Sequence, residues 1–224
     1  MNGAPQLRFG SPPVMVQVQP SRYWDTESST AQTIKAMCAG IHRSVSDEQI
    51  RTAARLVPSV WGRVGSPAVA FQHIDRASRE MAGVAIADWW FAKHFIHFVQ
   101  DAALVLRLAG LQDALEALTD PTVMIREVHP QGDCDCFTMF LCALMQAQHI
   151  PWEIVTLACS PRQPGVWSHV FPRAVIGGLY LPMDASHGKY PGWSVPSRDI
   201  QRLQVWDASG NPISGPVSVD EEVM

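Results

Sequence analysis

Apolar residues recur at intervals of three and four through the first part of the chain. Between residues 26 and 60 this spacing defines two apolar faces, formed by Ile34, Met37, Cys38 and Ile41, then by Ile50, Ala53, Ala54 and Val57. Such spacing is typical of amphipathic helices that pack on a core. Ser46 followed by Gln49 has the form of a capping box, which predicts that the second helix begins there.

Further helices are expected within residues 68–100 and over the shorter segments 111–118 and 121–126, with Ser66-Pro67 as a helix start. The 68–100 stretch holds an aromatic cluster, expected in the core rather than at a ligand: Trp89, Trp90, Phe91, Phe95 and Phe98. His94 and His97 lie among these residues and are expected to be structural. Only Val14–Val18 alternates like a half-buried strand. The pattern therefore predicts a mostly helical lead-in over residues 25–126.

The pattern changes in the second half of the chain. A helix is predicted from Cys134 to Gln148, because Ile150 precedes a proline and such residues avoid helical angles. Strands are predicted at 152–159, 166–176, 179–184 and 203–206, and Gly177-Gly178 predicts a hairpin turn. This order predicts an α+β fold, with a helical N-terminal half and an antiparallel sheet packed on the cysteine-bearing helix.

Composition limits the function classes. The 224 residues are 47% hydrophobic and 17% charged, as in a globular protein, and we expect one domain with a core over 127–206 and an irregular tail over 207–224. No apolar run approaches the ~20 residues that span a bilayer, so no membrane partner is expected. A net charge of −4 without a basic block argues against nucleic acid. Met1–Pro13 lacks an export signal pattern, which predicts a location in the cytoplasm of a bacterial host or in a virion.

The five cysteines are not expected to form disulfides, because their number is odd and no export signal precedes them. Three of them, Cys134, Cys136 and Cys142, do not have the spacing of a zinc knuckle. No metal and no cofactor is therefore expected. Free thiols in a reducing compartment remain, and for Cys38, Cys136, Cys142 and Cys159 the interpretation is a small buried apolar residue.

Cys134 differs because it begins a predicted helix. Asp133 is placed to act as its N-cap, which puts Cys134 in the first turn. Unpaired backbone N–H groups and the helix dipole favour an anion there, and such positions lower the pKa of a cysteine. The sequence therefore predicts that Cys134 is a nucleophilic thiol.

His169 and Asp184 are predicted to face each other across the hairpin. If Gly177-Gly178 form the turn, counting back along both strands sets Phe171 opposite Asp184. His169 then lies on the same face, one diagonal step away, within reach of a carboxylate–imidazole contact. A strand histidine is more often structural, and a bulge at a proline in either strand would slip the register. Both alternatives stay open.

Together these three residues form a candidate Cys-His-Asp set for attack on a carbonyl. Cys134 would be the nucleophile, His169 would exchange the proton, and Asp184 would hold the imidazole tautomer. The Cys134 backbone N–H would meet the oxyanion. Gln131 and Trp167 are further candidates for oxyanion and substrate contacts.

The order of these motifs resembles the transglutaminase-like superfamily. The matching segments are Gly132-Asp133-Cys134-Asp135, Ile150-Pro151, Ser168-His169-Val170 and Pro182-Met183-Asp184-Ala185. They are similar to the family's Gly-Asp-Cys-Asp-Asp helix, Gly-(Ile/Val)-Pro turn, (Ser/His)-His-(Val/Ala) strand and closing Asp strand. Upstream, the aromatic helix at Trp89 to Phe98, and Glu116 followed by Asp120-Pro121, resemble the lead-in of compact bacterial and phage members.

The resemblance covers roughly residues 14 to 206 and implies a papain-like fold with its triad on Cys134, His169 and Asp184. Two positions depart from the family pattern. Cys136 stands where the motif has its second Asp, and His149 stands where the turn has Gly. His149 must therefore adopt a left-handed or similar backbone angle.

Two functions follow as expectations. The first is a cysteine-dependent hydrolase or transamidase that acts on amide or peptide bonds of a protein or peptide substrate. The second is a structural or assembly protein of a tailed-phage particle that keeps the fold and binds virion proteins. An intact triad favours the enzyme, because a purely structural protein need not retain three aligned polar groups.

Overall fold

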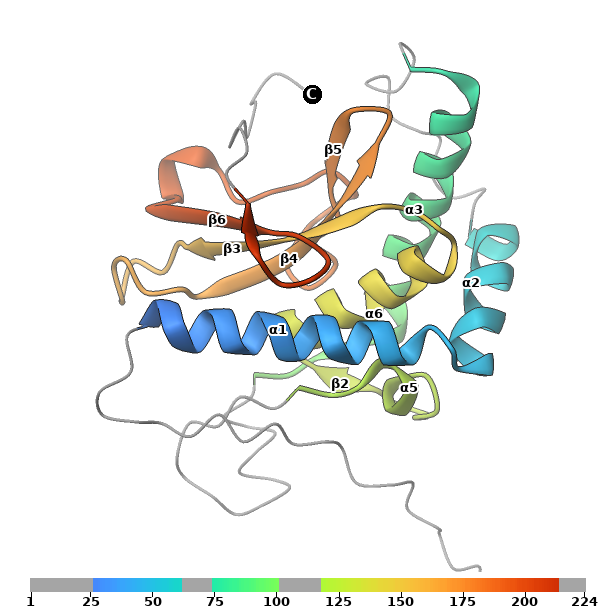
Figure 1. The fold of residues 1–224 in the computed structure, drawn as a ribbon, viewed down its shortest axis with the longest axis horizontal. Helices are drawn as coiled ribbons and strands as arrows, with labels where there is room; N and C mark the ends of the chain where they lie inside the picture. Colours follow the sequence, from blue (N-terminus) through green and yellow to red (C-terminus); the bar gives the residue numbers. More distant parts are fainter. Residues whose placement is uncertain (1–25, 62–73, 101–117, 214–224) are drawn as a thin grey trace, which may run out of the picture.

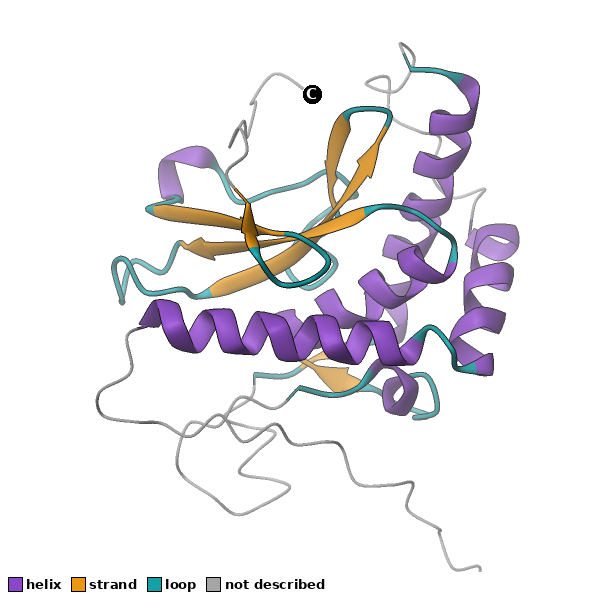
Figure 2. Cartoon of the chain, in the orientation of Figure 1, coloured by secondary structure: helices purple, strands orange, loops and turns teal. Residues whose placement is uncertain are grey.

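The computed structural model describes residues 26–61, 74–100 and 118–213. Helices and an antiparallel sheet pack together, as the α+β class predicts, and helix α6 (Cys134–Ala147) lies between the sheet and the other helices (Figures 1 and 2). The predicted strand at Val14–Val18, the helix start at Ser66-Pro67 and positions 111–117 lie outside the described residues. No helix within the three described ranges combines the length and apolar character that a membrane crossing needs.

The helices of the first half follow the predicted periodicity. They are α1 (Thr26–Ser44), α2 (Glu48–Trp61), α3 (Arg76–Phe95) and the single turn α5 (Pro121–Met124). The two apolar faces are buried except at Ala53, which is half-buried; the other seven residues are each 5% exposed or less: Ile34, Met37, Cys38, Ile41, Ile50, Ala54 and Val57. Burial of these faces against α6 accounts for the helices, because short helices are marginal in isolation.

The start of α2 differs from the predicted capping box. Asp47 caps this helix, and its Oδ1 accepts the backbone N–H groups of Gln49 at 2.9 Å and Ile50 at 3.3 Å. The Ser46 hydroxyl instead donates to the Arg43 carbonyl at 3.0 Å. Ser46 therefore makes its hydrogen bond to the last turn of α1, and the next residue, Asp47, provides the cap of α2.

The chain leaves helical geometry earlier than predicted after α3. Ile96 has an extended backbone, and β1 (His97–Phe98) pairs in parallel with β2 (Gln131–Gly132). Phe98 is therefore not in the core as expected but 40% exposed, whereas Trp89 is fully buried. The N–H of His97 donates to the Pro130 carbonyl at 2.9 Å, so a segment far along the chain replaces the helical hydrogen bond.

The main sheet is antiparallel, with strand order β5-β4-β3-β6-β7. Its strands are β3 (Trp152–Ala158), β4 (His169–Ile176), β5 (Leu179–Pro182), β6 (Arg202–Trp206) and β7 (Pro212–Ile213). The region 166–168, predicted as strand, precedes β4, and β7 lies in the segment predicted to be an irregular tail. The main chain of Trp206 pairs with Pro212, which adds this edge strand.

Two turn predictions are confirmed. Ile176 pairs with Leu179, and Gly177 and Gly178 have φ angles of 58° and 81°. Two positive φ angles define the hairpin turn whose twist matches the strands, and glycine adopts them without strain. His149, after α6, has a φ of 60°, the left-handed angle expected where the family pattern has glycine.

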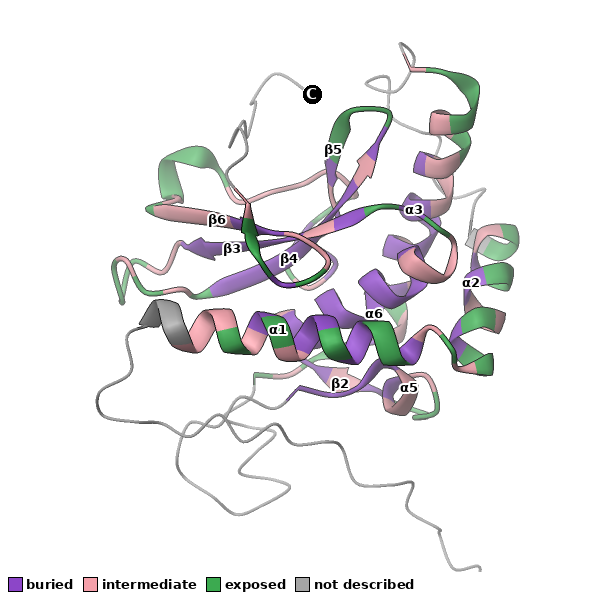
Figure 3. Cartoon of the chain, viewed as in Figure 1, coloured by how far each residue is buried: buried purple, intermediate pink, exposed green. Residues whose placement is uncertain are grey.

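Helix α6 is the centre of the core. Its residues from 135 to 145 are all buried, and Figure 3 shows it as a buried helix beside the partly exposed α1 and α2. A helix that is apolar on every side requires cover on every side. Strands β3 and β4 cover one side of α6, and α1, α2, α3 and α5 cover the rest.

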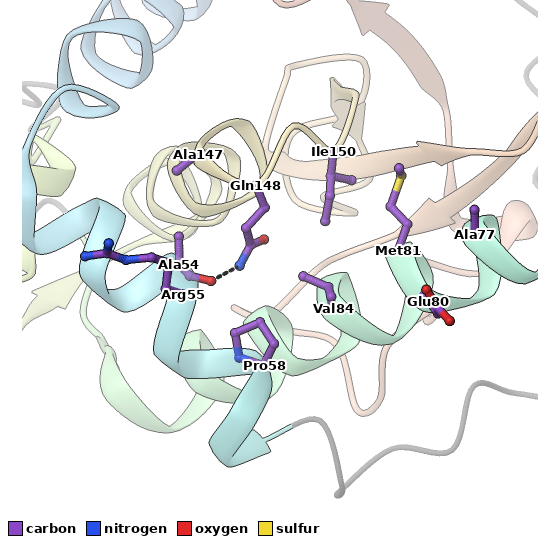
Figure 4. Close-up of a pocket in the computed structure, with 10 residues that line it drawn as sticks. All are labelled: Ala54, Arg55, Pro58, Ala77, Glu80, Met81, Val84, Ala147, Gln148 and Ile150. Atoms are coloured by element: carbon purple, nitrogen blue, oxygen red, sulfur yellow. Dashed lines mark hydrogen bonds between the residues drawn. The ribbon is translucent and has the colours of Figure 1, made fainter.

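A buried carboxyl group lies where α3 meets the end of α6. Asp88 is fully buried, and its Oδ1 accepts from Gln148 Nε2 at 3.1 Å. Burial raises the pKa of Asp88 well above its usual range, and the Gln148 hydrogen bond opposes the rise only in part. Gln148 also lines a cavity of about 450 Å³ between α2, α3 and the end of α6 (Figure 4).

We expect the raised pKa of Asp88 to make the protein less stable as pH rises. The folded state holds this proton above the unfolded pKa of about 3.9, so stability falls from there until the folded carboxyl ionises. Asp88→Asn keeps an amide partner for Gln148 and should lose this decline. The stability of the variant relative to wild type should therefore be higher at pH 7 than at pH 4. Urea unfolding at pH 4, 5.5 and 7 measures the difference. Asp199→Asn, at an exposed position, is the control. If the free energy of unfolding changes with pH in the same way in wild type and in Asp88→Asn, the prediction is wrong.

Candidate active site

The start of α6 is shaped by close backbone packing. Asp133 has the extended backbone of an N-cap, and its carbonyl accepts the N–H of Phe137 at 3.1 Å. Its side chain makes no capping hydrogen bond, which corrects the predicted role of that carboxylate. At Gly132 an added Cβ would overlap the Cβ of Cys136. The glycine therefore allows the chain to pass close to the side of the helix.

Cys134 is half-buried in the first turn of α6. One turn later, the Thr138 hydroxyl lies 2.7 Å from the Cys134 carbonyl and 3.3 Å from the Val170 carbonyl. This hydroxyl thus links the first turn of α6 to the beginning of β4. Since Val170 follows His169, the thiol and the imidazole are carried by two elements that meet at this point.

The other cysteines have different surroundings. Cys38, Cys136 and Cys142 are buried, as predicted. Burial, followed by the charge of Asp207, raises the pKa of Cys38 to about 12, and burial raises the pKa of Cys142 well above its usual range. Cys136 Sγ lies 3.4 Å from the Thr119 N–H, so it fills a packed position. Cys159 was also expected to be buried, and this prediction is wrong: it is half-buried, as Cys134 is, and lies beside the Ser168 hydroxyl at the end of β3.

The structure brings His169 and Asp184 together. His169 Nε2 lies 2.7 Å from Asp184 Oδ2, and the two side chains are 6% and 1% exposed. The main-chain pairing of β4 with β5 ends at Arg173 and Pro182, with Asp184 just beyond. A carboxylate–imidazole contact with so little access to water fixes both the ring orientation and the tautomer.

The second oxygen of Asp184 is held by the turn that follows β5. Oδ1 accepts from the Ser186 hydroxyl at 2.8 Å and from the His187 backbone N–H at 2.9 Å. Burial alone would raise the pKa of Asp184, but the contact with His169 and these two hydrogen bonds bring it below its usual value. Asp184 is therefore a carboxylate with both oxygens engaged.

His187 is a site residue that the sequence interpretation missed. Its ring meets the His169 ring edge-on, with centroids 4.8 Å apart and planes at 80°. Although the residue as a whole is exposed, its ring lies between those of His169 and Phe98, and this partial burial, followed by the charge of His169, lowers the pKa of His187. The sequence signal was its position three residues after Asp184, at the start of His187-Gly188, because an aspartate often accepts backbone N–H groups in the following turn.

Of the two weaker candidates, Gln131 lies in β2, two residues before Asp133, with its backbone paired to His97. Trp167 precedes β4, and its indole ring packs against the guanidinium of Arg202 at 4.6 Å. The ring contacts of His169 are instead with Phe171 and His187. The side chains that lie together are therefore those of His169, Asp184 and His187. Trp167 instead packs beside β6.

Within residues 26–61, 74–100 and 118–213, two groups of side chains have donors close enough for a metal ion. The donor atoms of His169, Asp184 and His187 lie within 4.8 Å of one another, and so do those of Asp133, Asp135 and Cys136. In the first group, two of the donors already bond to each other. This arrangement suits proton exchange by His169 as well as metal binding, so the donors alone do not decide between them.

No protein-family model and no curated protein sequence matches the chain. Similar solved structures include a proposed cysteine protease from Cytophaga hutchinsonii, with a TM-score of 0.42 and 19% identity. Another is a proposed protease from Parabacteroides distasonis ATCC 8503, with a TM-score of 0.43 and 12% identity. The alignments cover 72% and 80% of this chain but 44% and 30% of those chains. The chain thus matches less than half the length of either protein.

Proposed function

We propose that this protein is a cysteine-dependent acyl-transfer enzyme that cleaves or exchanges an amide bond of a protein or peptide, with a papain-like, transglutaminase-like arrangement. Cys134 is the nucleophile, His169 the acid and base, and Asp184 the residue that orients the imidazole. The observation that carries the proposal is the buried 2.7 Å contact between His169 Nε2 and Asp184 Oδ2. A carboxylate held at both oxygens is suited to keep the imidazole in one orientation, as a general base requires.

In this proposal the two ring nitrogens of His169 have different roles, which the contact with Asp184 supports. With Nε2 facing Asp184, Nδ1 is the nitrogen that exchanges a proton with the thiol. We expect the Cys134 sulfur within ~4 Å of Nδ1, a resting distance that shortens when substrate binds. The positive end of α6 favours the thiolate, and a proton passed from the thiol to His169 would stabilise it further.

The reaction then proceeds in two steps. The thiolate attacks the amide carbonyl, and the Cys134 backbone N–H donates to the oxyanion. His169 gives its proton to the departing amine as the C–N bond breaks, which leaves a thioester on Cys134. Water or a second amine attacks the thioester, His169 takes the proton from it, and the C–S bond breaks. Hydrolysis and cross-linking share the thioester and differ in the group that resolves it.

The reactivity of Cys134 tests the proposal. Treatment with iodoacetamide followed by peptide mass spectrometry gives the alkylation rate of each thiol as a function of pH. We expect Cys134 to react fastest, with its rate retained below the usual thiol pKa of about 8.5. Cys159 is the internal control, because it is also half-buried but does not begin a helix. If Cys134 is no faster than Cys159 or a free peptide thiol at neutral pH, the alternative of a non-catalytic assembly protein replaces the enzyme.

A further inference from the structure

Phe98 lies against the first turn of the nucleophile helix. Its Cα pairs with Gly132 in the short β1–β2 ladder, and Gly132 is two residues before Cys134. Its ring centroid lies 6.5 Å from that of Phe137, which is three residues after Cys134 in α6. Two separate contacts therefore place Phe98 next to the turn that carries the thiol.

The rings of Phe98, His187 and His169 form a continuous row, which we call the aromatic row. Phe98 and His187 meet edge-on, with centroids 4.8 Å apart and planes at 75°. His187 and His169 meet in the same way at 4.8 Å and 80°. Edge-to-face contacts of this kind hold rings in defined orientations. The row runs from the start of α6 to the candidate catalytic histidine.

The outer part of the aromatic row is open to solvent. Phe98 is 40% exposed and His187 is exposed, whereas His169 is 8% exposed. A phenyl ring left in water beside a reactive group is typical of a binding surface, because covering it is favourable. Partial burial lowers the pKa of His187, which disfavours a charge on its ring. Lys93 Nζ donates to the Ser186 carbonyl at 3.3 Å.

We propose that Phe98 and His187 form one wall of a subsite that binds a flat apolar side chain, such as a phenyl ring, on the acyl group that reaches Cys134. The inference rests on the proposed function and adds the class of substrate. A phenyl group in this subsite packs on the exposed face of Phe98 and on the His187 ring. An acyl group with a charged side chain loses this contact and pays for desolvation.

Two alkylating amides test the subsite. Iodoacetamide and N-benzyl-iodoacetamide react in the same way, since the thiolate sulfur attacks the CH₂ carbon and iodide leaves, and they differ in one benzyl group. The readout is the ratio of the benzyl rate to the parent rate at Cys134, divided by the same ratio for a free peptide thiol. We expect this normalised ratio to be about 5 to 10 in the wild-type protein, as one ring contact provides.

Three variants of the aromatic row and one control variant outside it show whether the row causes the higher ratio. Phe98→Ala should lower the normalised ratio to within about twofold of unity, and His187→Ala should lower it by a smaller factor. His187→Phe keeps a ring and should keep the ratio, which separates packing from proton transfer. Leu56→Ala truncates an apolar residue that is 57% exposed on α2 and should leave the ratio at the wild-type value. If Phe98→Ala is too unstable to purify, His187→Ala against His187→Phe gives the same comparison.

The absolute rate and the ratio report on different proposals. A fast parent rate at Cys134 with a normalised ratio near unity overturns the subsite and leaves the proposed function intact. A slow parent rate with a high ratio that falls in Phe98→Ala supports an apolar binding site beside a thiol and overturns the enzyme. A ratio that Phe98→Ala and His187→Ala both leave unchanged also overturns the subsite.

Discussion

Replacing His169 with alanine is expected to lower the amide-cleaving activity by at least about 10³-fold, because general acid–base catalysis alone contributes about 10²–10⁴ and the thiolate also loses its imidazolium partner. The fold should survive, since Asp184 keeps its hydrogen bonds to Ser186 and to the His187 backbone. A fluorogenic peptide assay measures the activity. The iodoacetamide rate of Cys134 at pH 6 to 8 measures the loss of thiolate independently of substrate.

A matched variant separates this effect from a general loss of histidine. His94→Ala removes an exposed histidine of α3 whose ring stacks on Trp90 at 5.6 Å, and it should retain wild-type activity. Thermal unfolding of both variants completes the comparison. Wild-type activity in His169→Ala together with a large fall in melting temperature would identify His169 as a structural core residue.

Replacing Gly188 with alanine is expected to destabilise the fold by about 3 kcal/mol, the upper part of the range for overpacking a rigid site. An added Cβ would overlap the backbone carbonyl oxygen of Asp184. This oxygen belongs to the main chain, so it cannot move aside as the end of a flexible side chain could. The Gly188 N–H also donates to that carbonyl at 3.1 Å and closes the turn. The turn must shift, and the Asp184 carboxylate shifts with it, so activity should fall together with stability.

Gly83→Ala provides the control with the opposite sign. An added Cβ at Gly83 meets nothing within 4 Å, and the residue lies inside α3. Alanine is more favourable than glycine in a helix by up to about 1 kcal/mol, so this variant should be stabilised. Denaturant unfolding of both variants measures the two changes. Equal stability of Gly188→Ala and wild type would show that the turn accommodates a side chain.

The sequence by itself determined the elements whose signals are local. The spacing of apolar residues at intervals of three and four located the buried faces of α1 and α2, and Ile150-Pro151 located the end of α6. The Gly177-Gly178 turn set the pairing of β4 with β5, because a two-residue hairpin fixes the register of both strands. Counting from that turn was enough to place His169 and Asp184 within reach of each other.

Tertiary structure decided the features that depend on distant segments. Phe98 carries the same apolar signal as Trp89, yet one is 40% exposed and the other buried, because β2 takes up the hydrogen bonds of the chain after α3. His187 joins the site only because its turn folds back onto Asp184, and Asp47 rather than Ser46 caps α2 because Ser46 closes α1. Periodicity reports which face of an element is apolar, whereas long-range pairing decides what covers that face and what remains open beside Cys134.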